Sequence, residues 1–517
     1  MFGGTTHRRL YLLSLSGIGF FLPLSVFMTS LFIFMVLINW LIEGGIRKKL
    51  DKYRSDKSLI IYSVAYLVYL IWMLNTSDLW YGLHALKLKI PLILLPVLIG
   101  TSGNLDRIER KIILSSLIIG LMIATIAGSA YSIIISSGLI DRRELSVFIS
   151  HIRLSLMICL GIFIAGYYFT EAIGRNIFVR SCYLISGLWL TAFLFIMFSF
   201  TGVIIFSILL IWLVVRLSAR LSKGAGIAGL SLAISVTSLI AVFIIHQIKD
   251  YTTLREPDII EEGIMTFSGK EYTHDPGRKD VENGYFVWRY ICEEELRREW
   301  NGISDIDYEG IDLRGHQLKY TLIRYLTSIG VRKDSAGVSE LGRDDIRTIE
   351  SGYANVIYLD GTGIRDKFYE TIWQIDYYLD GGNPQGHSVT QKLDFFLTGY
   401  RVFRAHPLFG TGTGDMVKEI LMQYERDGSK LDLQFRRMPH NQYLTVLISF
   451  GIVGFILFWG AMLLPIFIRG KARDLLFSVF LIIILLSMIG EDTLETHTGV
   501  TFFALCYGIF LFSNGKS

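Results

Sequence analysis

The stretch Tyr443–Phe467 reads YLTVLISFGIVGFILFWGAMLLPIF, 25 residues without one charged side chain. A bilayer core needs roughly 20 apolar residues in each helix that crosses it. The whole chain shares this character, because 52% of its 517 residues are hydrophobic, 19% are charged and the mean hydropathy is +0.46. A soluble domain has about 45–50% apolar and about 25% charged residues. The composition excludes a soluble enzyme, a disordered protein and a disulfide-stapled secreted domain, and it predicts a polytopic membrane protein.

Similar apolar stretches recur along the chain and predict an all-α fold with about twelve transmembrane helices. Pro23 divides the first long stretch, which predicts either a tight hairpin or one kinked helix. The expected spans cover about 10–24, 25–43, 57–75, 88–102, 111–134, 152–170, 181–197, 201–217, 225–246, 443–467, 473–489 and 498–512.

Lysine and arginine are concentrated in alternate connections between these spans. Such residues are enriched in cytoplasmic loops, so the bias predicts that both termini are cytoplasmic. The expected inner set is Arg8, Arg9, Arg47, Lys48, Lys49, Lys52, Arg54, Lys57, Arg107, Arg110, Lys111, Arg175, Arg180, Arg216, Arg220, Lys223, Arg469, Lys471, Arg473 and Lys516. The short outer loops hold only Lys87, Lys89, Arg142, Arg143 and Arg153.

One connection is far longer than the others and is polar, mixed in charge and aromatic-rich. It covers residues 248–442 and lies outside the cytoplasmic membrane on the predicted topology. The pattern predicts a packed, mostly helical domain, with helices over Tyr285–Trp300 and Gln317–Ile329. The expected organisation is therefore helices 1–9 over residues 1–247, the loop domain over 248–442 and helices 10–12 over 443–517.

The end of this loop combines cations with glycines. The segment Lys392–Asp415 reads KLDFFLTGYRVFRAHPLFGTGTGD, which predicts a helix followed by a glycine-rich loop. The glycines do not match GxxxxGK[ST], and a plain turn is favoured over a phosphate loop. Arg401 and Arg404 share a helix face. A guanidinium group can bind two oxygens of one phosphate at the same time.

Other polar residues stand where spans begin. His440 and Asn441 directly precede the tenth span; a histidine is largely neutral at pH 7 and accepts a proton, and Asn441 either orients a ligand or caps the helix. Arg153 opens the sixth span, and Lys87 and Lys89 precede the fourth. Cations within a membrane span usually pair with a partner or serve a function. Near the interface, however, such side chains reach the headgroup region at little cost. A functional and a purely structural role therefore both stay open.

Three strings together resemble the O-antigen ligase family, which includes related O-antigen polymerases. They are RAHPLFGTGTGD at 404–415, PHNQYL at 439–444 and FGIVG at 450–454. The twelve-span layout, the large outer loop before the tenth span and SFTG at 199–202 are similar as well. The sharp motif covers about residues 391–455, and residues 250–385 look like a lineage-specific insertion.

The resemblance implies an inverting GT-C-type glycosyltransferase of the bacterial inner membrane that uses neither a metal nor another cofactor. It implies transfer of a glycan from undecaprenyl pyrophosphate to a sugar hydroxyl of lipid A-core at the periplasmic face. The formal net charge of +4 is too small to suggest a nucleic-acid partner. His440 matches the essential histidine of the family. Two family arginines are replaced, one by Phe200 and one by Lys392. Lysine keeps the positive charge but cannot bind two oxygens at once as a guanidinium group does.

These residues define a mechanistic hypothesis. Lys392 and Arg401, helped by Arg404 and Arg153, hold the pyrophosphate, while His440 accepts the proton of the acceptor hydroxyl. The residues that replace the missing arginine remain open among Arg401, Arg404, Arg153 and Arg142. Supporting roles fall to Asn441, Lys87, Lys89 and Arg142.

Two alternatives differ in acceptor or in class. An O-antigen polymerase has the same fold and donor but joins lipid-linked repeat units. A polysaccharide or lipid transporter would place ionisable groups near mid-membrane and often shows inverted repeats. The obvious cations stand at the outer face and no repeat is evident, which favours a transferase.

Overall fold

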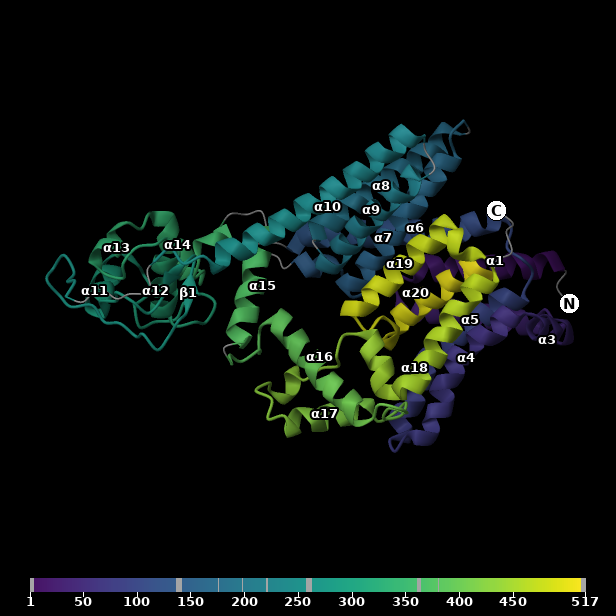
Figure 1. Ribbon diagram of the computed structural model, residues 1–517. Helices are drawn as coiled ribbons and strands as arrows, with labels where there is room; N and C mark the ends of the chain where they lie inside the picture. Colours follow the sequence, from purple (N-terminus) through teal and green to yellow (C-terminus); the bar gives the residue numbers. More distant parts are fainter. Residues whose placement is uncertain are drawn as a thin grey trace. The chain divides into compact units, whose positions relative to one another are not determined.

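The computed structural model describes residues 4–135, 142–174, 176–197, 199–219, 222–256, 263–359, 364–379 and 381–512. Its described part is mostly helical and divides into two compact units (Figure 1). Residues 1–226 and 391–517 form the first, here called the membrane unit. Residues 227–390 form the second, the insert unit. The expected loop domain, 248–442, is thus divided between the two.

The membrane unit is built from long apolar helices joined by short turns. Its helices are α1 (Gly4–Phe21), α2 (Val26–Ile42), α3 (Ile46–Ser55), α4 (Lys57–Ile71), α5 (Leu79–Thr101), α6 (Arg107–Ile135), α7 (His151–Glu171), α8 (Ile177–Met197), α9 (Phe200–Ser218), α16 (Ser388–Ala405), α17 (Met416–Arg426), α18 (Gln442–Ile468), α19 (Leu475–Gly490) and α20 (His497–Tyr507). Short 3-10 turns include η1 (Trp72–Asn75), η2 (Arg142–Leu145), η5 (Lys471–Arg473) and η6 (Thr493–Glu495).

The insert unit consists of α10 (Lys223–Thr252), nearly all of which belongs to it, and a small domain that follows. This domain contains a two-stranded antiparallel hairpin, β1 (Val281–Glu282) with β2 (Tyr285–Phe286). Its helices are α11 (Glu293–Ile303), α12 (Leu318–Ser328), α13 (Ser335–Ser339), α14 (Arg343–Glu350) and α15 (Ile364–Leu379), with the 3-10 turn η3 (Val356–Leu359). A core around Trp300, Leu322 and Leu326 holds the domain together.

Every predicted span falls on a helix, and the protein is a polytopic membrane protein. Among the described residues, eight helices are long and apolar enough to cross a membrane. A ninth results if α2 and α3, which meet at a bend of 108°, count as one span. The helices α19 and α20 are shorter apolar helices. A total of twelve spans therefore stays a prediction.

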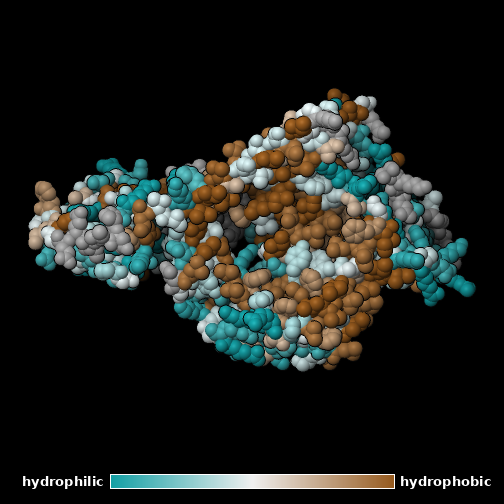
Figure 2. Space-filling view, viewed as in Figure 1, coloured by the Kyte–Doolittle hydropathy of each residue, from teal (hydrophilic) through white to brown (hydrophobic). Residues whose placement is uncertain are grey.

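The surface of the membrane unit has separate hydrophilic and hydrophobic regions (Figure 2). Hydrophilic residues cover α3 and α17, and hydrophobic residues cover much of the surface between them in this view. Many large apolar side chains of the helices are exposed, among them Phe34 on α2, Leu70 on α4 and Ile456 on α18. Exposed apolar surface of this extent fits contact with lipid.

The first two helices form a tight hairpin, so the single kinked helix is the wrong alternative. A turn at Leu22–Leu24, which includes Pro23, separates α1 from α2. The helices pack antiparallel, since His7 Nδ1 near the start of α1 lies 2.9 Å from Asn39 Oδ1 near the end of α2.

Two predicted boundaries are wrong. The fourth span begins at Leu79 instead of 88, because Asp78 caps α5 by accepting a hydrogen bond from the Tyr81 N–H. The helix predicted from Tyr285 begins only at Glu293, since Tyr285 and Phe286 belong to the β-hairpin. The helix predicted over Gln317–Ile329 is confirmed as α12.

The glycine-rich loop after α16 is a structural turn, as expected. Its N–H groups are already bonded: Thr411 N–H donates to Ile448 O at 2.8 Å and Gly412 N–H to Ser449 O at 2.9 Å. The Asp415 carboxylate accepts hydrogen bonds from the Ser77 and Asp78 N–H groups at 2.6 and 2.8 Å. The loop thus fastens α18 to the connection between α4 and α5 and leaves no cradle for phosphate.

Gly412→Ala should destabilise the protein by about 1–3 kcal/mol, because φ is 97° and a Cβ atom would lie 2.2 Å from Asn75 O. The measurement is the midpoint of thermal unfolding in detergent. Gly460→Ala on α18 is the matched control, since a Cβ atom there meets nothing within 4 Å. Equal midpoints for the two variants would contradict the packing described for this loop.

Candidate active site

The candidate site is built at the beginning of α18. His440 adopts the left-handed backbone conformation, with φ at 49°, immediately before the helix. Asn441 follows in extended conformation and caps α18, its side-chain oxygen accepting the Leu444 N–H at 2.9 Å. The strained backbone at a non-glycine residue fixes where the imidazole leaves the chain.

A short acidic turn, residues 491–495, lies against this helix start. Three residues at the beginning of α18, its N-cap included, hold this turn. The Asn441 amide donates to Ile489 O at 2.9 Å, just before the turn. Buried Gln442 accepts the Leu494 N–H at 2.7 Å and donates to Glu495 at 3.1 Å. Thr445 donates to the Asp492 carboxylate at 2.7 Å.

Glu491 in this turn links two residues that the sequence analysis selected. One carboxylate oxygen, Oε1, lies 3.0 Å from Lys392 Nζ on α16. The other, Oε2, lies 3.9 Å from Nδ1 of His440. The side chain of Glu491 is largely buried, with 9% of it exposed. The carboxylate therefore stands between the cation and the imidazole, on the Nδ1 side of the ring.

The environment favours the neutral form of His440. Burial lowers the pKa of His440 below its usual value, and the positive charges of Lys392, Arg153 and Arg437 act in the same direction. The Glu491 carboxylate opposes them by raising this pKa. A neutral imidazole at pH 7 is a proton acceptor, which is the form that general-base catalysis requires.

Arg153 reaches the same site from the first turn of α7. Its Nε donates to the Thr496 hydroxyl at 2.7 Å, directly after the acidic turn. Glu491 and Asp492 are the acidic groups whose charges act on Arg153. We call His440, Glu491, Lys392 and Arg153 the charged cluster.

The beginning of α9, where the family pattern has arginine, adjoins the beginning of α7. Ser199 donates to the Ser155 hydroxyl at 3.0 Å, and Ser155 lies two positions after Arg153. Phe200 itself is exposed. Of the candidate replacements whose side chains the structure describes, Arg153 is the one whose charge acts on His440.

The other predicted cations have different surroundings. Arg401 follows Lys392 by about two and a half turns of α16, on the opposite face, and its guanidinium pairs with Asp427 at 2.7 Å. Arg404 and Lys87 are exposed. The side chain of Arg142 lies outside the described part of the structure. Of the predicted cations whose side chains the structure describes, Lys392 and Arg153 are therefore the two whose charges act on His440.

Lys89 on α5 contacts the acidic turn and holds it in place. It is completely buried in α5, where its ammonium lies 2.7 Å from the Glu495 carboxylate and donates to Leu494 O. The Tyr69 ring on α4 lies 5.3 Å from the same ammonium. A buried cation with these partners holds the turn in place.

Lys89→Met should destabilise the protein by about 3–5 kcal/mol, because it leaves Glu495 without its buried cation. Thermal unfolding in detergent measures the loss. The double variant Lys89→Met/Glu495→Gln should regain a large part of it, since neither charge then remains. A single variant as stable as the wild type would show that the ion pair does not hold the turn.

Sequence reasoning missed the acidic turn and Arg437. Residues 490–496 read GEDTLET between two apolar stretches, so three carboxylates lie in the connection between the last two predicted spans. Charged side chains at such a boundary are costly unless they have partners or a function, and this signal was available. The approach of Arg437, three residues before His440, depends on the irregular segment at 436–441, which no local pattern predicts.

Comparison with known proteins gives one family match, which covers part of this site. Residues 353–459 match the family model described as O-antigen ligase. No curated protein matches the chain. The matched segment contains Lys392, His440 and most of α18, whereas Arg153 and Glu491 lie outside it.

The helices and the cluster thus define a polytopic membrane protein with a charged site at one end of its apolar helices. The match confirms the resemblance seen in the sequence: the chain carries a domain of the O-antigen ligase family.

Proposed function

We propose that this protein is an O-antigen ligase. It transfers a glycan from undecaprenyl pyrophosphate to a sugar hydroxyl of lipid A-core. The observation that carries the proposal is that Lys392 and His440 meet at one carboxylate, Glu491, with Arg153 anchored at Thr496 beside the same turn, within a chain that has an O-antigen ligase domain.

The donor places a pyrophosphate next to the anomeric carbon of the sugar. The bond from that carbon to the pyrophosphate oxygen breaks, and the electron pair stays on the oxygen. Lys392 and Arg153 supply positive charge for this leaving group in a partly buried site, where charge stabilisation is stronger than in water. Arg437, exposed beside His440, adds a third cation on the solvent side.

The acceptor hydroxyl attacks the anomeric carbon from the face opposite the leaving group, so the configuration inverts. Its proton passes to His440, which the site keeps neutral before the reaction. We assign this role to Nε2, since Nδ1 faces Glu491. A GT-C-type transfer of this kind draws its charge stabilisation from side chains, and we propose that it proceeds without a metal or another cofactor.

Glu491 is a positioning residue in this scheme. Its carboxylate orients the imidazole through Nδ1 and stabilises the imidazolium that forms when His440 takes the proton. At 3.9 Å the two groups do not yet form a hydrogen bond, and we expect the contact to shorten when substrate binds.

The charge arrangement predicts opposite pH effects for two variants. In the wild type the rate falls as the pH drops through the His440 pKa, which lies below its usual value. Glu491→Gln removes a charge that raises this pKa, so the acid limb should move to lower pH with a lower plateau. Lys392→Met removes a charge that lowers it, so the limb should move to higher pH. Profiles of kcat against pH that shift together would contradict the role of His440.

The distribution of cations supports a periplasmic site in the inner membrane. At the end of the membrane unit opposite His440, Arg8 donates to Glu109 at 2.7 Å and Arg469 pairs with Asp56. Lys52 lies at the same end, bonded to Ser102 O. Lysine and arginine mark cytoplasmic ends. We therefore place both termini in the cytoplasm and the charged cluster at the periplasmic face.

Reconstitution tests the ligase assignment against polymerisation. Purified protein in lipid is given undecaprenyl-pyrophosphate glycan, lipid A-core and EDTA, without nucleotide sugar. The products are separated on gels and identified by mass spectrometry. A ligase moves the glycan to lipid A-core. Glycan that lengthens while still on undecaprenyl pyrophosphate would assign the chain to polymerisation instead.

A further inference from the structure

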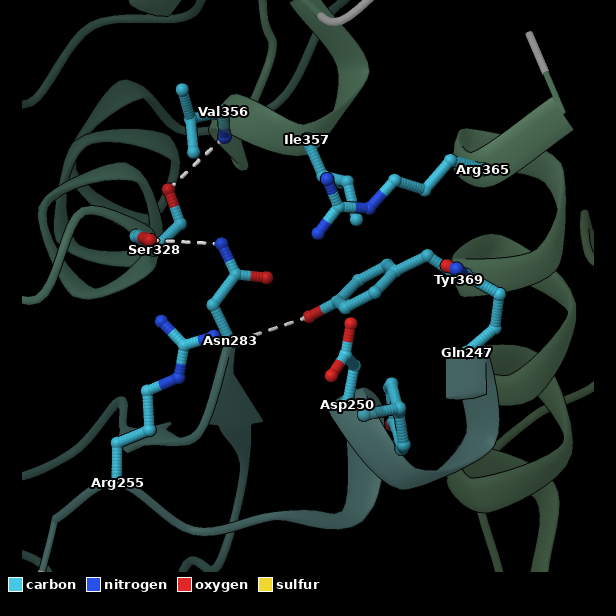
Figure 3. Close-up of a pocket in the computed structure, with 10 residues that line it drawn as sticks. Gln247, Asp250, Arg255, Asn283, Ser328, Val356, Ile357, Arg365 and Tyr369 are labelled. Atoms are coloured by element: carbon cyan, nitrogen blue, oxygen red, sulfur yellow. Dashed lines mark hydrogen bonds between the residues drawn. The ribbon is translucent and has the colours of Figure 1, made fainter. Parts of the chain in front are cut away.

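The insert unit contains a polar pocket that the proposed chemistry does not use (Figure 3). Its volume is about 240 Å³. The last two turns of α10, the β-hairpin, the end of α12, η3 and the start of α15 all contribute to its wall. The lining residues are Gln247, Asp250, Tyr251, Arg255, Asn283, Ser328, Val356, Ile357, Arg365 and Tyr369.

A buried network fixes the floor of this pocket. Glu282 accepts the Arg324 Nε–H at 2.7 Å and the Tyr369 hydroxyl at 3.0 Å. Asn355, also fully buried, donates to Glu282 at 2.5 Å and to the Tyr369 hydroxyl at 3.1 Å. The Tyr369 ring therefore has one orientation before any ligand arrives. Pre-organisation of this kind lowers the entropic cost of binding.

The wall of the pocket mixes donors, acceptors and an aromatic face. Figure 3 shows the carboxylate of Asp250 and the guanidinium group of Arg365 beside the Tyr369 ring, and the guanidinium group of Arg255 beside Asn283. The Tyr251 ring lies 5.2 Å from that of Tyr369. A hydroxyl group both donates and accepts, so a ligand rich in hydroxyls needs both kinds of partner, while its C–H face packs on an aromatic ring.

Charge in the pocket argues against a simple phosphate site. A phosphate needs donors and positive charge. Here Asp250 stands among the arginines, and Asp376 accepts the Tyr251 hydroxyl at 3.1 Å close by. Acidic groups repel an anion but accept hydrogen bonds from a neutral ligand. The lining therefore suits an uncharged polyhydroxylated ring.

The pocket also stands at a suitable place along the chain. α10 is one of the helices able to cross a membrane, its candidate span running Gly224–Thr252. Gln247, Asp250 and Tyr251 occupy the end of that span. A ligand in the pocket is therefore near the membrane surface, where the sugars of a lipid-linked glycan emerge.

We propose that this pocket binds a neutral sugar residue of the glycan substrate, and that the insert unit is a glycan-binding module of the enzyme. The proposal rests on the proposed function, because that function supplies the glycan. The volume suits a single sugar ring and is below the 300–1,000 Å³ typical of sites for drug-sized ligands.

Direct binding tests the pocket without transfer. The probe is the oligosaccharide released by mild acid from lipopolysaccharide of the native organism, titrated into the full-length protein in nanodiscs and followed by calorimetry. Asp250→Ala/Arg365→Ala should weaken binding at least tenfold. Asp344→Ala/Arg347→Ala, a pair of exposed residues on α14 outside the pocket, should bind as the wild type does.

Three results would overturn the proposal. The first is a wild type that does not bind the oligosaccharide, and the second is a pocket variant that binds it as well as the wild type does. The third is that inorganic phosphate or dihexanoyl phosphatidylglycerol binds instead, and that the pocket variant weakens this binding. The last result would make the pocket a phosphate or lipid-headgroup site.

A transfer assay separates failure of the pocket from failure of the function. If the wild type transfers glycan while the pocket variant keeps the same KM for donor and acceptor, the pocket proposal fails and the function stands. If no transfer occurs but the oligosaccharide binds in a pocket-dependent way, the function fails and the pocket stands. Both proposals are supported if the pocket variant raises KM and leaves kcat unchanged.

Discussion

His440→Ala lowers kcat for glycan transfer by about 10²–10⁴-fold, the range that a general base contributes. The reason is geometric as well as chemical. The imidazole is held in its neutral form beside Glu491, and alanine leaves the acceptor hydroxyl without a base. The measurement is the initial rate of glycan transfer in reconstituted protein, with both substrates saturating.

His406→Ala is the matched control for this variant. His406 stands in the same family segment but is exposed at the end of α16. Its rate should stay within about twofold of the wild type, since surface substitutions are usually mild. Full activity of correctly inserted His440→Ala protein would remove His440 from the mechanism.

Arg153→Met should be the second most damaging change, with a loss of about 10²–10³ in kcat, as for other groups that stabilise developing charge. We propose that the Arg153 guanidinium supplies the charge that the family pattern places at Phe200. It is anchored at Thr496, beside the acidic turn. Arg153→Lys should recover part of the rate, because it keeps the charge and loses the fork.

Lys392→Arg gives the complementary result. It restores the arginine of the family pattern and should retain activity, whereas Lys392→Met should have a markedly lower but still measurable kcat. Arg426→Met, on the exposed end of α17, serves as the control for loss of one positive charge. A larger loss from Arg401→Met than from Arg153→Met would place the pyrophosphate along the other face of α16 and contradict the proposed site.

Local patterns predicted the helices well because each membrane helix must bury its own backbone polar groups in an apolar stretch. Every expected span falls on a helix, and the turn at Pro23 and the glycine-rich loop at 410–414 were visible as breaks. The start of α11 was not, since the hairpin at 281–286 depends on pairing between separate residues.

The site was only half predictable for a related reason. His440 and Lys392 belong to motifs that are contiguous in sequence. Arg153 and Glu491 come from α7 and from the turn after α19, and only packing of these helices brings them to α18. Long-range contacts of this kind have no local signature, so Arg153 could not be separated from Arg401 or Arg404 in advance.

The most direct test of the central claim is the stoichiometry of one turnover. Reconstituted protein receives undecaprenyl-pyrophosphate glycan labelled in both parts, together with lipid A-core, and mass spectrometry counts the products. We predict one undecaprenyl pyrophosphate released for each glycan joined to lipid A-core, and both products formed about 10²–10⁴-fold more slowly with His440→Ala. Glycan that crosses the membrane still attached to its lipid would contradict the account and identify a transporter.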